Sequence, residues 1–166
     1  MLASFAFAQD KPSATATAPG CGLANTKFEV KTDSQQHPIA QPESGKALLY
    51  FIEDDTSFSS RPKPTTRLGI DGNWAGATQG NSYFYLSITP GEHHLCASWQ
   101  SRVLLFSERK AAAAHFTAEA GRVYYYRVKN IWGQYSAADI SLEPLDSDEG
   151  QLLMSKFAFS TFHPQK

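Results

Sequence analysis

The stretch LGIDGNWAGATQGNSYFYLSITPGEHHL, from Leu68 to Leu95, decides how this chain folds. Four glycines and a Pro-Gly pair lie among residues that favour strands. Asp71 and Gly72 tolerate the positive φ of a tight turn, and Pro90 with Gly91 has the residue preference of a type II turn. Two further glycines are expected in the connection between strands, where a missing side chain allows a sharp bend: Gly76 and Gly80. The stretch therefore predicts successive strands joined by turns.

Phosphate and calcium loops are excluded by the spacing in this stretch. Its glycines fit neither G-x-x-x-x-G-K-[ST] nor a G-x-G-x-x-G that opens a helix. A calcium loop needs several spaced carboxylates, and the first acidic residue after Asp71 is Glu92. The glycines therefore predict a fold and not a chemistry.

Histidines are the candidate metal ligands. His93 and His94 are adjacent, and His115 is a third candidate further along the chain. Neighbouring residues of a strand point to opposite faces, so these two do not readily ligate one ion. Structural histidines are the expectation, with no metal and no cofactor.

Strand patterns continue on both sides of the opening stretch. KALLYFIED, from Lys46 to Asp54, is apolar on both faces, as in a central strand, and Gly121 marks a turn before RVYYYRV. SRVLLFSERK, residues 101–110, is compatible with a strand or a short helix. Asp146 and Glu149 form a capping-box pattern that predicts a helix from near Ser147. The expected fold class is all-β: a single antiparallel β-sandwich of about seven strands, with an irregular N-terminal arm and a short C-terminal helix.

The length and composition of the chain limit its domain organisation. With 166 residues, 42% of them hydrophobic, the chain can bury one core, and a formal net charge of -1 provides no basic stripe for nucleic acid. No apolar run beyond the N-terminus is long enough to span a membrane. We expect residues 1–8 to be the remainder of a signal peptide, 9–44 the irregular arm, 45–145 the sandwich, and 146–166 the C-terminal helix and tail.

Export is predicted from the N-terminal residues and from the two cysteines. MLASFAFAQD contains an A-x-A pattern ending at Ala8, with cleavage expected before Gln9. Cys21 and Cys96 suit a disulfide in an oxidising compartment. A periplasmic or outer-envelope protein with one bridge is the expectation. The alternatives are a cytoplasmic protein with an ordinary apolar N-terminus, two unrelated thiols, or a lipid anchor at Cys21.

Aromatic residues provide the candidate binding surface. Rings offer contact area with little entropy lost on binding, so a platform for a sugar or a peptide is predicted from Trp74, Tyr83, Tyr85, Tyr125 and Trp132. The alternative is that they form cross-strand pairs on a sheet face partly covered by the N-terminal arm. Candidate catalytic groups are fewer, because no G-x-S-x-G elbow is present. The cluster of Glu53, Asp54 and Asp55 is interpreted as a solvated strand end.

These motifs resemble one known family. KALLYFIED, the opening stretch and FTAEAGRVYYYRV together resemble the DUF2846 domain, a bacterial exported or lipoprotein family of unknown function. The inner pattern h-x-h-D-G-x-x-x-G, followed by a strand and Pro-Gly-x-His, also resembles PEGA-type β-sandwich modules. The resemblance covers roughly Lys46 to Leu145 and is carried by turn and strand-edge residues, so it implies a fold and transfers no catalytic residue. The chain has no convincing lipobox of the kind that anchors some relatives.

The functional expectation is a non-enzymatic exported module of the bacterial cell envelope or periplasm. It would bind an envelope protein or a glycan through a sheet face or the loops, or serve as a structural spacer. The alternative is a small envelope hydrolase or glycan-processing enzyme that uses His93, His94 or the Glu53 to Asp55 cluster. Two titratable groups converging on a pocket would favour that alternative.

Overall fold

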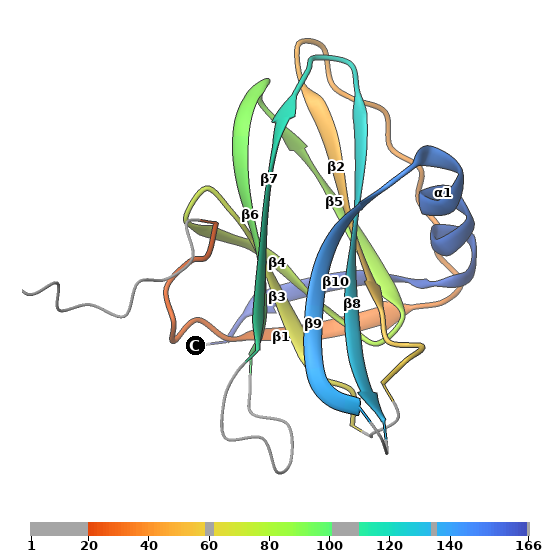
Figure 1. Ribbon diagram of the computed structural model, residues 1–166. Coiled ribbons are helices and arrows are strands. Elements are labelled where there is room, and N and C mark those ends of the chain that lie inside the picture. The colour runs from red at the N-terminus through yellow and green to blue at the C-terminus, as the bar shows by residue number, and fades with distance from the viewer. Residues whose placement is uncertain (1–19, 59–61, 101–109, 134–135, 166) are drawn as a thin grey trace, which may run out of the picture.

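The computed structural model describes residues 20–58, 62–100, 110–133 and 136–165. Within these ranges the chain forms ten strands and one α-helix (Figure 1). The signal-peptide prediction for residues 1–8, the part of the predicted arm before Gly20, and the open choice at residues 101–109 lie outside the described residues.

The described strands form two sheets. The six-stranded sheet has the order β1 (Phe28–Asp33), β10 (Ala158–Pro164), β5 (Ser82–Ile88), β2 (Ala47–Asp54), β8 (Val123–Gly133) and β9 (Ser136–Leu145). The four-stranded sheet has the order β4 (Asn73–Gln79), β3 (Thr65–Ile70), β6 (Gly91–Trp99) and β7 (Ala111–Ala118). The all-β prediction is confirmed. The described residues form more strands than the expected seven, and two of the additional strands are β1, from the predicted arm, and β10, from the predicted tail.

Two of the strand pairs are parallel, which corrects the prediction of a purely antiparallel fold. β2 pairs in parallel with β8, and β5 pairs in parallel with β10. The chain leaves β2, builds the four-stranded sheet and one strand of its own sheet, and then returns beside β2. Such a return cannot be recognised from turn signals, because parallel neighbours need a long crossover.

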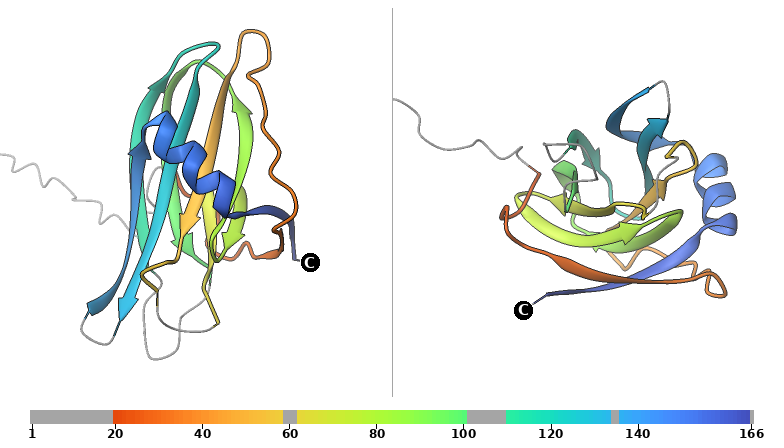
Figure 2. Two further views of the ribbon diagram at one scale, coloured as in Figure 1. Left: turned by 90° about the vertical axis from the view of Figure 1, so that its right-hand side faces the viewer. Right: turned by 90° about the horizontal axis from the view of Figure 1, so that it is seen from below.

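The main core lies between the two sheets. Leu49 and Phe51 of β2 point inward and meet Leu68 of β3, Leu95 and Trp99 of β6, all of them buried. The alternate residues of β2 point to the outer face of the six-stranded sheet and belong to a second buried cluster. Every residue of β2 is buried, which is what its two-sided apolar sequence predicts. In Figure 2 the helix lies against this outer face.

The predicted turns carry the expected backbone. Asp71 and Gly72, between β3 and β4, have φ of 51° and 81°. Gly121 precedes β8 with φ of 78°, and Gly91 opens β6, directly after Pro90, with φ of 132°. Each of these conformations suits a residue that tolerates positive φ.

Gly76 has a different role from the one predicted. It lies inside β4 and not in a turn. A Cβ atom at this position would sit 2.3 Å from Cζ of Phe162 in β10. The missing side chain therefore makes room for an aromatic ring of the facing sheet, which is a long-range reason that a local pattern does not reveal.

The capping prediction at the C-terminal helix is confirmed. Helix α1 (Ser147–Lys156) begins after Asp146, whose carboxylate accepts a hydrogen bond of 2.8 Å from the Glu149 amide. The chain then continues into β10, so the predicted tail is a strand. Its Phe162 reaches the main core, whereas Phe157 and Met154 belong to the second cluster.

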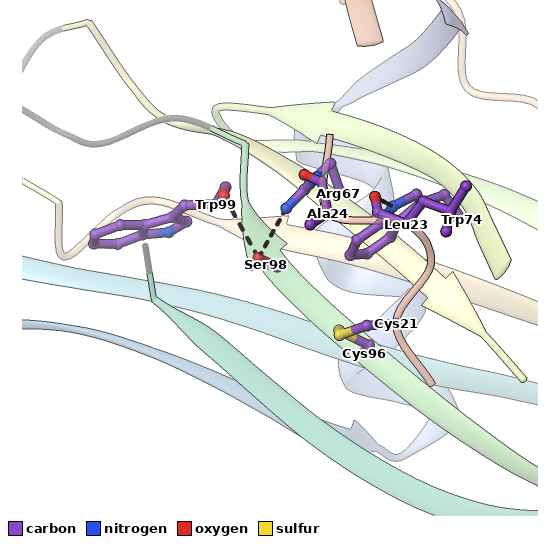
Figure 3. The surroundings of a disulfide bond; sticks show 8 residues. All are labelled: Cys21, Leu23, Ala24, Arg67, Trp74, Cys96, Ser98 and Trp99. Carbon is purple, nitrogen blue, oxygen red and sulfur yellow. Dashed lines mark hydrogen bonds between the residues drawn. A yellow bond between two sulfur atoms is a disulfide. The ribbon is translucent and has the colours of Figure 1, made fainter. Parts of the chain in front are cut away.

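A tethered segment, residues 20–26, crosses the outer face of the four-stranded sheet (Figure 3). The predicted disulfide joins Cys21 to Cys96 of β6. The Trp74 indole donates to the Leu23 carbonyl at 2.8 Å, and the Arg67 guanidinium donates to the Ala24 carbonyl at 2.8 Å. The arm is irregular here, as expected, but it is bonded to the sheet along its length.

Candidate functional site

A pocket of about 580 Å³ opens on the outer face of the six-stranded sheet. We call it the tyrosine pocket, because three tyrosines of neighbouring strands line it: Tyr50 of β2, Tyr83 of β5 and Tyr125 of β8. Helix α1 forms one wall, and residues 37–41, which precede β2, form the other. The volume lies in the range of small-ligand sites.

The tyrosine rings are held by one another and by one backbone bond. Tyr50 and Tyr125 are stacked at 5.2 Å between ring centroids, and Tyr50 and Tyr83 are 6.3 Å apart. The Ala40 amide donates to the Tyr50 hydroxyl at 3.0 Å. Among the described residues, no hydrogen bond reaches the Tyr83 hydroxyl, although this ring lines the same pocket. The Tyr50 phenol is therefore bonded within the fold, whereas the Tyr83 phenol has no partner among the described residues.

Two contacts fix the walls of the tyrosine pocket. His37 contacts the Met154 carbonyl through Nδ1 at 2.9 Å, which ties residues 37–41 to α1. Gly150 lets α1 approach the sheet, because a Cβ atom there would sit 2.6 Å from the Tyr125 ring. Arg127 of β8 forms a 2.7 Å ion pair with Glu149 near the start of the helix. The pocket is thus the space left between a helix and a sheet that are firmly connected.

The lining of the tyrosine pocket contains no acidic or basic side chain apart from His37. Apart from His37, its side chains are apolar, aromatic, amide or hydroxyl: Ile39, Ala40, Gln41, Tyr50, Tyr83, Val123, Tyr125, Gln151, Met154 and Ser155. Burial raises the pKa of Tyr83 to about 12, and burial also raises the pKa of Tyr50. Both phenols therefore stay protonated and can donate hydrogen bonds.

The structure brings three of the five predicted aromatic residues together. Tyr83, Tyr85 and Tyr125 belong to the second cluster, around Tyr50. Trp74 lies on the outer face of the other sheet, under the Arg67 guanidinium, 4.3 Å from the ring centroid. Trp132 contacts Phe58 at one end of the molecule. The five residues do not form one platform.

Sequence reasoning missed Tyr50 and the two walls of the tyrosine pocket. Tyr50 lies in a strand that is apolar on both faces, and this pattern predicts burial of the whole strand without singling out the Tyr50 ring. The alternation of the strand is the signal that points to Tyr50. Tyr50 lies on the same face as Leu48 and Ile52, whereas Phe51 lies on the opposite face. Helix α1 was predicted, but nothing in its sequence shows which sheet it covers.

A second group of polar residues is buried between the sheets. We call it the acid pair cluster: Glu53, Asp55, Thr66, Thr78, Trp99 and Asn130, each at most 2% exposed. The Asn130 amide nitrogen donates to Glu53 at 2.8 Å and to Asp55 at 2.7 Å. The Trp99 indole donates to the Asn130 oxygen at 2.8 Å, which fixes the orientation of that amide. The interpretation of this segment as a solvated strand end is therefore corrected, because Glu53, Asp54 and Asp55 are all buried.

Both carboxyl groups of the acid pair cluster hold protons more tightly than usual. Burial raises the pKa of Asp55 to about 6, against the opposing effects of the Asn130 hydrogen bond and the Lys63 charge. Burial, and then the neighbouring Asp55, raise the pKa of Glu53 well above its ordinary value. A cavity of about 570 Å³ lies at this end of the sheets, lined by Asp55, Pro62, Lys63, Gln79, Gly80 and Asn81. The converging pair borders a pocket, but both carboxyls lie almost fully below its surface.

The histidines occupy structural positions. His93 is buried, with Nδ1 at 2.6 Å from the Asp71 carboxylate and Nε2 at 2.7 Å from the Thr89 carbonyl. Burial lowers the pKa of His93, but these two acceptors outweigh it and the net pKa is raised. Both ring nitrogens lie at hydrogen-bond distance from protein oxygens, so neither is directed at an open metal position. His94 points to the opposite, exposed face, where its ring lies 6.3 Å from that of His115.

In the part of the chain that the structure describes, no three His, Cys, Asp or Glu side chains are arranged to hold a metal ion. No helix within the described ranges has the length and apolar character that a membrane crossing requires.

Comparison with known proteins yields a family. The model of the family described as "Protein of unknown function (DUF2846)" matches residues 43–144. An uncharacterized protein of Haemophilus influenzae is 24% identical over 134 residues, which cover 81% of this chain and 73% of that protein. No solved structure shows a significant match to the chain. The family match includes β2 to β9, while β1, α1 and β10 lie outside it.

Proposed function

Because the chain belongs to the DUF2846 family, whose function is unknown, we propose a function from the tyrosine pocket itself. The protein is a non-enzymatic binding module of the bacterial cell envelope or periplasm. Its tyrosine pocket takes an uncharged ligand, either a segment of a partner protein or a glycan. The fold acts as a β-sandwich scaffold that positions the pocket.

One observation carries this proposal: three tyrosines from adjacent strands line one pocket whose other walls carry no acidic or basic side chain except His37. A charged ligand would lose its hydration there without gaining a partner. A neutral ligand can place an apolar group against the rings and hydrogen-bond to the Tyr83 hydroxyl, Gln41 or Gln151. Aromatic walls with a few polar groups are the usual composition of such sites.

Export is supported by the disulfide. Cys21 and Cys96 are bonded, and bonds of this kind persist in oxidising compartments such as the periplasm. The bond joins the first described residues to β6, so it would form only after both cysteines reach such a compartment.

A hydrolase is the second candidate, because Glu53 and Asp55 converge beside a cavity. General acid and base groups must come within hydrogen-bond reach of the substrate. Asp55 lines the cavity, but Glu53 is fully buried and does not line it, so the two carboxyls do not face one substrate site together. The separation of Glu53 from the cavity therefore favours the binding module.

The test is a binding screen, followed by a substitution that fills the tyrosine pocket. Wild-type protein is applied to arrays of neutral and charged glycans and of extended peptides, and each hit is measured by calorimetry. Gln151→Trp places an indole at the pocket wall, and we expect it to weaken binding of an uncharged hit at least roughly tenfold, which corresponds to about 1.4 kcal/mol.

Leu152→Trp is the matched control. It adds the same ring to the same helix at an exposed position that does not line the pocket. Its affinity should equal that of the wild type. Hits that are all charged, or hits that Gln151→Trp leaves unchanged, would contradict the proposal.

A further inference from the structure

The acid pair cluster joins the two sheets through a chain of buried hydrogen bonds. Glu53 and Asn130 come from β2 and β8 of the six-stranded sheet, and Thr66 and Trp99 come from β3 and β6 of the four-stranded sheet. The Thr66 hydroxyl donates to Glu53 at 3.1 Å. Because Trp99 holds the Asn130 oxygen, the amide can only donate toward the carboxyls.

Two carboxyl oxygen atoms of this cluster lack a hydrogen-bond partner. Oε2 of Glu53 and Oδ2 of Asp55 are both buried and unpaired. An unpaired buried oxygen is costly, and two ionised carboxylates side by side are more so. A proton on one of the carboxyls removes both costs, since it cancels one charge and supplies the missing donor.

We propose that Glu53 and Asp55 form a buried proton-binding site, in which the two carboxyl groups share one proton at neutral pH. The proton resides on Glu53, which is fully buried, and is donated to Asp55. The bound proton is a structural ligand that stabilises the contact between the two sheets at this end of the molecule.

The charged groups around the pair favour this assignment. Lys63 donates from Nζ to the backbone carbonyls of Asp55 and Phe58, so its charge acts on Asp55 and lowers the pKa of that residue. Asp54 acts in the opposite direction on Asp55, and its own carboxylate accepts from the Thr56 hydroxyl at 2.6 Å. The residues of the other strands that hydrogen-bond to Glu53 are uncharged: Thr66, Thr78 and Asn130. No cation faces Glu53 within this set, so the proton stays on Glu53.

The direction of the pH dependence follows. Both carboxyls have a higher pKa in the folded protein than in the unfolded chain, so the folded state binds more protons. The stabilisation is complete at low pH and is lost as the pH rises through the folded pKa values. For Asp55 the loss occurs between its ordinary pKa of 3.8 and about 6, and for Glu53 it extends to higher pH.

Infrared spectroscopy of the folded wild-type protein tests the proton directly. We expect the carbonyl band of a buried protonated carboxylic acid at pH 7. Glu53→Gln should abolish this band, because the introduced side-chain amide supplies a donor to Asp55 without a titrating proton. The melting temperature of the wild type should fall by roughly 5 °C between pH 5 and pH 8, and Glu53→Gln should reduce that fall by more than half.

Glu119→Gln is the matched control, because Glu119 is exposed and the substitution is the same. It should keep both the band and the pH dependence of the wild type. Asp55→Asn is a second variant that should also flatten the pH dependence, so the test survives if Glu53→Gln does not fold. A wild type without the band at pH 7 would overturn the proposal. So would a melting temperature that Ca²⁺ or Mg²⁺ raises and chelation lowers, since the pair would then hold a metal.

Discussion

The outer faces of the two sheets are both covered, but by different means. On the four-stranded sheet, the tethered segment packs backbone against backbone: a Cβ atom on Gly20 would sit 2.5 Å from the carbonyl carbon of Leu95. A disulfide holds it in place. On the six-stranded sheet, α1 and residues 37–41 pack against side chains of the sheet. Hydrogen bonds and one ion pair hold them in place.

This difference explains why the tyrosine pocket lies under the helix and not under the tethered segment. A glycine-containing segment can lie flat on a sheet and leave no space beneath it. A helix rests on its side chains, and the space beside it is filled only if those side chains are large enough. Gly150, the residue of α1 that faces Tyr125, brings the helix close, and the tyrosine pocket is what remains between the helix and residues 37–41.

Removing the disulfide should have the largest effect on stability. The bond closes a loop with a sequence separation of 75 residues, so Cys96→Ala with Cys21→Ala should cost about 4 kcal/mol in the free energy of unfolding. Urea denaturation measures the loss. Reduced wild-type protein should match the double variant, and binding in the tyrosine pocket should persist in both, since the pocket lies on the other sheet. Wild type recovered from the periplasm should be alkylated only after reduction.

Adding a methyl group at Gly150, where α1 contacts the sheet, should have an intermediate effect on stability. In the interior of a helix, glycine to alanine normally gains about 1 kcal/mol. Gly150→Ala should instead destabilise the protein by about 1–2 kcal/mol, because the new methyl group would overlap the Tyr125 ring. Leu152→Ala, at an exposed position of the same helix, should change the stability by less than about 0.5 kcal/mol. A stabilised Gly150→Ala protein would show that α1 is not held closely against the sheet.

Removing the hydroxyl of Tyr50 or of Tyr83 should have the smallest effects on stability, and the two losses should differ. Tyr50→Phe removes the acceptor of the Ala40 amide and should cost about 1 kcal/mol. Tyr83→Phe removes a hydroxyl that no described residue binds, and it should change the free energy of unfolding by less than about 0.5 kcal/mol. Thermal denaturation compares the two variants. Equal losses would mean that the Tyr83 hydroxyl also has a structural partner.

Local signals in the sequence predicted the features that short segments determine. The Asp71 and Gly72 turn, the Asp146 cap of α1 and the pairing of Cys21 with Cys96 all follow from residue types at short spacing or from a simple count. The all-β class follows from the recurrence of such turns. Each of these features depends on backbone conformation or on a single bond.

Features that depend on distant partners were not predictable. The parallel pairing of β5 with β10 joins residues from the opening stretch to the end of the chain. Glu53 is on the same face of β2 as Leu49 and Phe51, so the alternation of the strand indicates that it is buried. Its hydrogen-bond partner Asn130 lies 77 residues away in the sequence and could not be predicted. The five aromatic residues were grouped by type, and only the sheet order separates Trp74 from the tyrosines.

The tethered segment also determines how the molecule carries mechanical load. A pull applied at residue 20 passes through the Cys21 to Cys96 bond into β6, in the middle of the four-stranded sheet, before it reaches β1. β1 and β10 pair in antiparallel fashion, with Phe28 beside Pro164, so a direct pull on their ends would unzip them one hydrogen bond at a time. The disulfide diverts tension from that weak seam into a central strand of the other sheet, which gives a chain held from its N-terminal side a stiff point of attachment.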